Sequence, residues 1–338
     1  MTNKTLASIV IPNYNGKKYL EDCLGSLRAQ NVTDREIILV DNGSTDGSAA
    51  YVHSRFPEVR VLELDRNCGF AAACNHGILN SSGLYVLIIN NDTMTRPDCL
   101  ERLIATATRS PHTGMVAPKI LNFSRRDVID SLGVALYPDG TSRGALRLRK
   151  DPGTLTDERE ILCPSGCAAL YRRAMLDQIG LFDEDFFAYC EDTDLGLRGR
   201  LAGWNAYCNP QAVVYHKYSG TTLPFSRLKA YLVERNRIWV ALKNFPAPLL
   251  PLTLLFTLAR YQAALAACLL PRSSIAITAR SHNGERLFVT IARSWQNALA
   301  QSGRMVRKRR KIHGRKNLSL IGFLGYLIKY GLPLTGTM

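Results

Sequence analysis

The chain has 338 residues, of which 46% are hydrophobic and 21% charged, a composition typical of a globular protein and not of a disordered one. Its net charge of +15 is uneven: residues 241–338 carry 15 Lys and Arg against a single acid, Glu285, whereas residues 1–240 hold 28 against 27 acids. Nine scattered cysteines without a C-x-x-C pair argue against a structural zinc site and indicate free thiols in a reducing compartment.

The two ends of the chain indicate location and partners. Residues 1–7 are polar and short, unlike a signal peptide, so we expect residues 1–240 to stay in the cytoplasm. The basic residues of 241–338 suit an anionic surface, either phospholipid headgroups or nucleic acid. Pro246 and Pro248 mark a boundary, so we predict one large domain over 1–240 and a tail over 241–338.

Residues 7–118 alternate short apolar runs with helix-like stretches. We predict strands over 8–11, 37–40, 59–64 and 84–89, and helices over 17–30 and 70–80. Apolar runs of this length alternating with helices indicate a mostly parallel sheet with both faces covered. Ligands bind beyond the carboxyl ends of such strands, and three of the four strands run directly into Asn/Asp-rich loops.

The rest of the chain is less regular. Residues 119–160 are rich in Arg and turn formers, and we expect them to form an excursion over the sheet. Later elements are predicted as a strand over 162–171, a helix over 191–202, a short strand over 213–215 and a helix over 226–243.

Acidic residues follow two of the predicted strands. Asp41 follows the second strand and Asp92 the fourth, so both are expected to face one crevice, although Asp after a strand is also a common turn residue or helix N-cap. The oxygen-rich residues 90–93 can hold a hard cation such as Mg²⁺, which proteins bind through one or two carboxylates together with substrate phosphates. A simple polar turn is the alternative.

Residues 186–194 place aromatic side chains directly before Glu191 and Asp192. Acids in a first helical turn complement the helix dipole, which is the structural explanation. Aromatic side chains can also exclude water from a carboxylate and so tune a general base, which we expect for Asp192. His216 follows a short strand; a lone histidine is more often structural, but its imidazole can complete a metal site begun by Asp92.

Five of these segments together are similar to the family 2 glycosyltransferases of the GT-A fold, and to their bacterial rhamnosyltransferase-like branch. The segments follow the family order, cover about residues 6–240 and leave the tail outside; they are residues 9–16, 40–48, 66–75, 90–93 and 187–198. The resemblance implies an α/β fold of GT-A type, with a mostly parallel central sheet flanked by helices and a helical, basic and apolar tail.

The resemblance also implies site residues. The implied donor-binding residues are Pro12, Tyr14, Asp41, Arg66, Asn67, Gly69 and Asn91. The first three would hold the base and ribose, and residues 66–69 would lie along the diphosphate-sugar. Asp92, at the last position of the family's D-x-D motif, and His216 would bind Mg²⁺ or Mn²⁺. Asp192, paired with Glu191, would be the catalytic base. Asn90 departs from the motif, because it replaces the first carboxylate.

The implied reaction is an inverting transfer from a nucleotide diphosphate sugar to a hydroxyl of a lipid-linked or polysaccharide acceptor in cell-envelope glycan synthesis. The resemblance leans towards dTDP-rhamnose. An NAD-dependent enzyme would need G-x-G-x-x-G after the first strand, which residues 12–16 lack. The alternatives are a non-catalytic sugar-binding module and a nucleic-acid-binding protein that uses residues 307–311, although nucleic acid does not require the apolar runs of the tail. We expect no nucleic-acid partner, and the oligomeric state is open.

The tail combines two apolar runs, 249–270 and 318–334, with a basic run over 304–316. The first run is long enough to span a bilayer, which needs ~20 apolar residues. Arg260 in its middle and Pro251 near its start favour helices that lie in the membrane interface, on the inner face of the cell membrane. Ordinary core helices or a dimer interface are the alternatives.

Overall fold

The computed structural model describes residues 5–217, 226–268, 284–314 and 316–334. The chain divides into two compact units, Met1–Val134 with Gly144–Thr221, and Ala135–Arg143 with Thr222–Met338. The domain boundary at residue 240 stays a prediction. Residues 219–221 of the loop after His216, residues 269–270 of the apolar run and residue 315 of the basic run lie outside the described residues.

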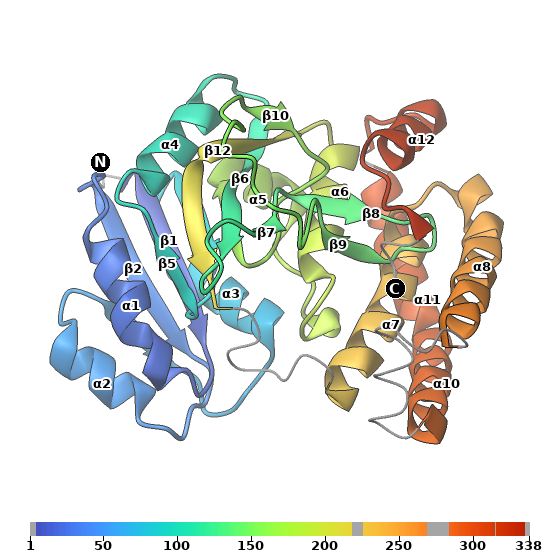
Figure 1. Cartoon of the computed structure of the whole chain (residues 1–338), viewed down its shortest axis with the longest axis horizontal. Helices are drawn as coiled ribbons and strands as arrows, with labels where there is room; N and C mark the ends of the chain where they lie inside the picture. Colours follow the sequence, from blue (N-terminus) through green and yellow to red (C-terminus); the bar gives the residue numbers. More distant parts are fainter. Residues whose placement is uncertain (1–4, 218–225, 269–283, 315, 335–338) are drawn as a thin grey trace. The chain divides into compact units, whose positions relative to one another are not determined.

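The first unit is built on a ten-stranded sheet of order β10-β12-β6-β11-β4-β1-β2-β3, with β5 paired to β12 and β7 to β6 (Figure 1). Its strands are β1 (Ala7–Asn13), β2 (Arg35–Asp41), β3 (Arg60–Glu63), β4 (Tyr85–Ile89), β5 (Thr93–Thr95), β6 (Thr113–Asn122), β7 (Ile129–Ser131), β10 (Arg159–Glu160), β11 (Ala168–Arg172) and β12 (Asn205–His216). Strands β3, β2, β1 and β4 are mutually parallel, as predicted, whereas β11 runs antiparallel to both β4 and β6. A hairpin of β8 (Val134–Leu136) and β9 (Ser142–Gly144) stands apart from this sheet.

Helices cover both faces of the sheet, which confirms the predicted α/β fold (Figure 1). They are α1 (Lys17–Arg28), α2 (Ser48–Arg55), α3 (Phe70–Leu79), α4 (Cys99–Thr108), α5 (Arg173–Ile179) and α6 (Glu191–Leu201), with a 3₁₀ turn, η1 (Glu184–Phe186). On one face Leu20 and Leu24 of α1 join Ile9 and Ile11 of β1 in the main core. On the other face α3 lies so close that a Cβ on Gly77 would stand 2.2 Å from Val10.

Three sequence predictions differ from the structure. Residues 119–122 belong to β6, so the excursion starts later than predicted. Strand β12 has twelve residues where three were predicted, because Asn209 and Pro210 interrupt its apolar pattern and its register shifts there. The strand predicted over 162–171 is shorter, Ala168–Arg172, since Pro164 and Gly166 break the run before it.

The second unit is helical, as the tail was predicted to be. Its helices are α7 (Arg227–Asn244), η2 (Ala247–Leu249), α8 (Leu250–Cys268), α10 (Gly284–Ala300), α11 (Ser302–His313) and α12 (Leu320–Lys329). Helix α7 is central and contacts α8, α10 and α11. Its Trp239 is fully buried and donates from Nε1 to the Ala298 carbonyl at 3.3 Å, and Phe245 packs on Phe323 with ring centroids 5.1 Å apart.

Helix α8 turns Thr257 and Arg260 inward, whereas Gln262 is exposed. Thr257 is 3% exposed, and Arg260 donates to Asp139 Oδ2 at 2.7 Å and to Glu234 Oε2 at 3.0 Å. Arg237 of α7 also bonds to both acids, so two carboxylates and two guanidiniums neutralise one another inside the unit. Most of the exposed large side chains of α8 are nevertheless apolar: Leu252, Leu254, Leu255, Phe256, Leu258 and Leu265. This is the reverse of a helix that faces water on one side.

One stretch of the described residues, Ala247–Ala266, is long and apolar enough to cross a membrane.

Candidate active site

Polar side chains tie together the ends of three neighbouring strands, β1, β2 and β4. Asn13 Nδ2 donates to Asp41 Oδ1 at 2.9 Å, and Asn91 Nδ2 donates to Asn13 Oδ1 at 2.7 Å. All three side chains are buried. A Cβ on Gly16 would lie 2.0 Å from Asn91 Nδ2, so a side chain there would displace Asn91. Asn13, which the sequence analysis did not assign to the site, therefore links two predicted donor-binding residues.

The loop after β2 is joined to residues 66–69 through Asn42. Its Nδ2 donates to Asn67 Oδ1 and to the Gly69 carbonyl, both at 3.1 Å. Gly43 has a φ of +73°, and a Cβ there would lie 2.6 Å from the Arg66 backbone. These contacts bring the two predicted donor-binding loops against each other.

The predicted donor-binding residues differ in exposure. Tyr14 is 41% exposed, and Arg66 and Asn67 are also exposed, whereas Pro12 and Asp41 are buried. The side chains of Tyr14, Arg66 and Asn67 are therefore accessible to a ligand, whereas Pro12 and Asp41 lie within the loops.

A turn with unusual backbone geometry precedes α6. Phe187, Tyr189 and Cys190 have φ values of 64°, 71° and 66°. Residues other than glycine rarely adopt such angles, which cost ~1–3 kcal/mol each and cluster at functional sites. Gly69 lies against this turn, because a Cβ on Gly69 would stand 2.6 Å from the Phe187 ring, and the Ala71 N–H donates to the Phe187 carbonyl at 3.2 Å. The turn that leads into α6 therefore packs against Gly69 and the start of α3.

The two acids at the start of α6 have different surroundings. Asp192 is half-buried; its Oδ2 accepts from the Gly166 N–H at 2.7 Å and its Oδ1 from the Thr193 N–H at 2.6 Å. Glu191 is buried, and its Oε2 has no hydrogen-bond partner among the described residues. Asp192 is therefore the more accessible of the two carboxylates.

Burial raises the pKa of both acids. For Asp192, hydrogen bonds from Gly166 and Thr193 oppose this effect, and the pKa remains above its usual value of 3.8. For Glu191, burial and then the charges of Asp192 and Asp194 raise the pKa well above 4.5, which favours the protonated form. A raised pKa suits Asp192 to accept a proton near neutral pH, since general bases act best with a pKa near the working pH.

A short irregular segment before β11 connects these acids with strand β4. The Gly166 N–H binds Asp192, as above, and the Cys167 carbonyl accepts from the Asn90 N–H at 2.9 Å. The Cys167 thiol also lies within hydrogen-bond reach of His216. The strand predicted over 162–171 included this segment, and that part of the prediction was wrong. Pro164 and Gly166 are the residues that indicate a turn here.

Asp92 and His216 meet at the ends of β4 and β12. His216 Nε2 lies 3.3 Å from Asp92 Oδ1, and His216 Nδ1 lies 2.7 Å from Asp130 Oδ2 on β7. Asp92 and His216 are both buried. The structure therefore brings the two predicted metal ligands together. It also places Asp130, which was not predicted from the sequence, beside His216.

The contact between His216 Nε2 and Asp92 Oδ1 needs either a proton or a metal ion between the two atoms. An ionised carboxylate only accepts hydrogen bonds, so with the proton on Nδ1 towards Asp130, the Nε2 lone pair faces Asp92 Oδ1. Burial lowers the pKa of His216, but Cys167, Asp130 and Asp92 together raise it well above 6.5, which favours a proton there in the metal-free protein.

One carboxylate and one imidazole fit a divalent cation that keeps water and substrate phosphates as its other ligands. Within the described residues, no group of three or more His, Cys, Asp or Glu side chains is arranged to hold a metal ion by itself.

Comparison with known proteins identifies the family. The sequence model described as "Glycosyl transferase family 2" matches residues 8–180. The N-acetylglucosaminyl-diphospho-decaprenol L-rhamnosyltransferase of Mycobacterium tuberculosis is 30% identical over 270 residues, which cover 68% of this chain and 85% of that protein. The chain belongs to glycosyl transferase family 2. It is a glycosyltransferase that takes its sugar from a nucleotide-sugar donor, of the rhamnosyltransferase-like branch.

Solved structures of other glycosyltransferases share the fold. The mannosyltransferase PcManGT of Pyrobaculum calidifontis, solved with GDP-Man and Mn²⁺, aligns with a TM-score of 0.53 and 19% identity over 89% of this chain and 88% of that one. GalNAc-T7, solved with UDP, GalNAc and Mn²⁺, aligns with a TM-score of 0.58 and 17% identity over 71% of this chain and 48% of that one. The GT-A fold expected for this glycosyltransferase is thereby confirmed.

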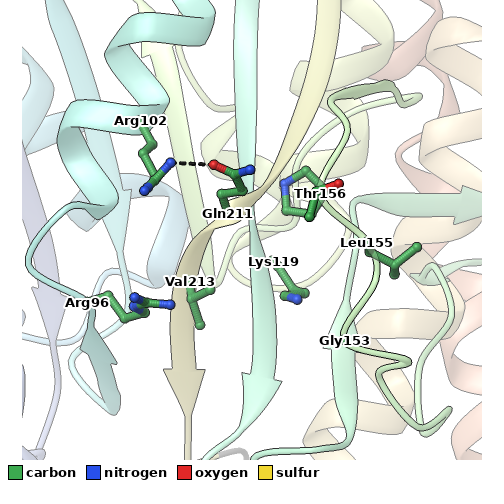
Figure 2. A pocket seen from close by; sticks show the side chains of 9 residues that line it. Arg96, Arg102, Lys119, Gly153, Leu155, Thr156, Gln211 and Val213 are labelled. Carbon is green, nitrogen blue, oxygen red and sulfur yellow. Dashed lines mark hydrogen bonds between the residues drawn. The ribbon is translucent and has the colours of Figure 1, made fainter.

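The glycosyltransferase also has a cavity of about 250 Å³ between α4, β12 and the loop around Gly153. Figure 2 shows Arg102 beside Gln211 there, and Lys119 farther along the same wall. Two of its cations are already paired, Arg102 with Asp98 at 2.7 Å and Lys119 with Asp151 at 2.6 Å. None of the predicted site residues lines this cavity.

Proposed function

We propose that this glycosyltransferase moves L-rhamnose from dTDP-L-rhamnose to a hydroxyl of a lipid-linked acceptor, with inversion, at the inner face of the cell membrane. One observation supports the catalytic mechanism in this proposal. Residues 166 and 167 bind Asp192 through the Gly166 N–H and adjoin the Asp92–His216 pair through Cys167. A proton acceptor and a cation-binding pair thus flank one short segment. The rhamnosyl donor and lipid-linked acceptor are taken from the relative in Mycobacterium tuberculosis.

Asp192 acts as the general base. The acceptor hydroxyl gives its proton to an Asp192 oxygen while its own oxygen bonds to the anomeric carbon. The bond from that carbon to the donor diphosphate breaks in the same displacement, and attack from the opposite face inverts the configuration. Hydrogen bonds from Gly166 and Thr193 hold the carboxylate in place, so little reorganisation is needed at the moment of reaction.

Asp92 and His216 would hold Mg²⁺ or Mn²⁺, which when bound neutralises charge on the departing diphosphate. Asn90 leaves this site with one carboxylate in its loop, so substrate phosphates become important ligands. Tyr14, Arg66 and Asn67 are exposed at the strand ends and are proposed to line the donor, with Asp41 and Asn91 fixed behind them by Asn13.

The second unit is proposed to bind the membrane. The apolar side chains of α8 point outward while its Arg260 is neutralised inside the unit, an arrangement suited to lipid contact. Helix α11 adds exposed basic side chains: Arg304, Arg307, Arg310 and Lys311. Each cation near an anionic surface contributes ~1 kcal/mol. Because Arg260 binds Glu234 on the charged helix α7, we propose that α8 lies in the interface and does not span.

Co-flotation with vesicles of rising anionic lipid content tests the membrane contact. A buried leucine contributes ~1.5–3 kcal/mol, so replacing Leu255 and Leu258 with Glu should reduce binding at least ~10-fold. Leu79→Glu is the matched control, since Leu79 is 74% exposed in the first unit. Equal binding by all three proteins would contradict the proposal. Binding of the parent that only detergent reverses would indicate a spanning helix.

A transfer assay tests the reaction itself. The purified full chain is incubated with Mn²⁺, one of several sugar nucleotides and vesicles that contain N-acetylglucosaminyl-diphospho-polyprenol. Rhamnosylated lipid formed from dTDP-L-rhamnose, with the anomeric configuration inverted, is the expected product. Transfer of another sugar would replace the donor assignment, and retention of configuration would exclude the role of Asp192 as base.

A further inference from the structure

Asp130 lies outside every motif that identified the site, in the turn-rich excursion. Strand β7 pairs Ile129 with Leu121 and Ser131 with Ile120 of β6, so Asp130 is an extra residue at a shift of register. Such β-bulges re-aim a side chain and are common beside active sites. Here the Asp130 carboxylate reaches past β6 to His216 on β12, with 13% of its side chain exposed.

The backbone of His216 is fixed independently of Asp130. Its carbonyl accepts from the Phe123 N–H at 2.9 Å, and the next residue, Lys217, donates its N–H to the Asp92 carbonyl at 2.9 Å. These backbone contacts do not set the angle of the imidazole ring, which depends on its side-chain contacts. Besides the Cys167 thiol, the ring contacts Asp130 at 2.7 Å through Nδ1 and Asp92 at 3.3 Å through Nε2, and Asp130 forms the shorter of these two contacts.

Resting on the metal role in the proposed function, we propose that Asp130 is a positioning residue that holds Nε2 of His216 towards Asp92 and so sets the affinity of the site for a divalent cation. Histidine ligands commonly bind a carboxylate through their second nitrogen, and loss of that partner costs ~10–100-fold in metal affinity. The need is greater in this chain, because Asn90 supplies no carboxylate. Arg147 Nε, 3.8 Å from Asp130 Oδ1, lies on the other side of the same carboxylate.

The test is calorimetric titration of Mn²⁺ into the full chain with saturating dTDP. Asp130→Ala should weaken Mn²⁺ binding ~10–100-fold, and Asp130→Asn, which keeps an acceptor oxygen, should weaken it less. Asp127→Ala, an exposed carboxylate of the same segment, is the matched control and should bind as the parent does. Melting temperatures measured without Mn²⁺ identify any variant that has lost its fold. If Asp130→Ala has lost its fold, the Mn²⁺ affinity of Asp130→Asn, whose side chain has nearly the same shape as the parent's, is compared with that of the parent.

The double variant Asp130→Ala/His216→Ala separates positioning from a general effect. If Asp130 acts through His216, the double variant binds Mn²⁺ as weakly as His216→Ala alone, because neighbouring residues that act together are not additive. Additive losses, or parent affinity in both Asp130 variants, would overturn the inference while leaving the metal role intact. Absence of Mn²⁺ binding by the parent would overturn the metal role together with this inference.

Discussion

The two units of the chain use charge in opposite ways. In the first unit the core is apolar, and acids and amides gather at the ends of the strands, where Asp41 and Asp92 lie. In the second unit two acids and two arginines pair in the interior around Arg260, and the leucines of α8 are exposed. The first arrangement is that of a water-soluble enzyme, and the second suits an apolar environment. From this difference we expect donor binding and the proposed contact with lipid to be separable properties of this chain.

The largest expected effect is on catalysis in the first unit. Asp192→Asn keeps the shape of the side chain but removes the base, so transfer should fall ~10²–10⁴-fold. Donor binding, measured by calorimetry, and vesicle binding by the second unit should both match the parent. Transfer within threefold of the parent would end the assignment of Asp192, and loss of vesicle binding would show that the two units are not separable.

The second prediction concerns the buried charges of the second unit. Glu234→Gln leaves an unbalanced guanidinium among Arg237 and Arg260, and breaking a buried pair in this way costs ~3–5 kcal/mol. Urea unfolding of the two proteins measures the difference. Glu58→Gln is the control, because Glu58 forms an exposed pair with Arg28 at 3.9 Å and should change stability by less than ~1 kcal/mol.

The same variant has a pH dependence of known sign. Burial acts to raise the pKa of Glu234, but Arg237 and Arg260 lower it from 4.5 to about 2. Its stabilising contribution is therefore complete above pH 4.5 and is lost as the pH falls towards 2. The stability difference between parent and Glu234→Gln should shrink over that range, and a difference that is constant with pH would contradict the pairing.

The smallest predicted effect is a gain of stability in the first unit. Since the pKa of Glu191 is raised well above its usual value of 4.5, burial of this acid destabilises the fold fully above the raised pKa, and the penalty shrinks as the pH falls from there towards 4.5. Glu191→Gln should therefore raise the melting temperature, by ~2–4 °C for each kcal/mol of relief, most strongly above the raised pKa, and the gain should be lost as the pH falls towards 4.5. A lower melting temperature at every pH would show that Glu191 is not strained by burial.

Local sequence patterns could identify the parts of the site that follow a strand or open a helix. Asp41, Asp92 and Asp192 each stand next to an apolar run or an aromatic cluster, so their positions in the fold could be predicted from neighbouring residues in the sequence. Asp130 carries no such signal, because its three-residue strand lies among turn formers and it reaches His216 across 86 positions in the sequence.

The orientation of α8 was unpredictable for a related reason. Hydropathy marks residues 249–270 as apolar but does not say which side faces the protein. That is decided by Arg260 and its partner Asp139, which lies 121 positions earlier. The close approach of Gly69 to Phe187 is likewise a long-range contact, and neither segment's sequence predicts it.

The most direct test of the separation between the two units is the rate of transfer by Leu255→Glu/Leu258→Glu with two acceptors. One is a long polyprenyl-diphosphate acceptor in anionic vesicles, and the other is a short-chain, water-soluble analogue of the same headgroup. We predict that the double variant loses at least ~10-fold in transfer to the vesicle acceptor, following its loss of membrane partitioning, and keeps the parent rate with the soluble analogue. Equal rates of parent and variant on both acceptors, or equal losses on both, would contradict the account.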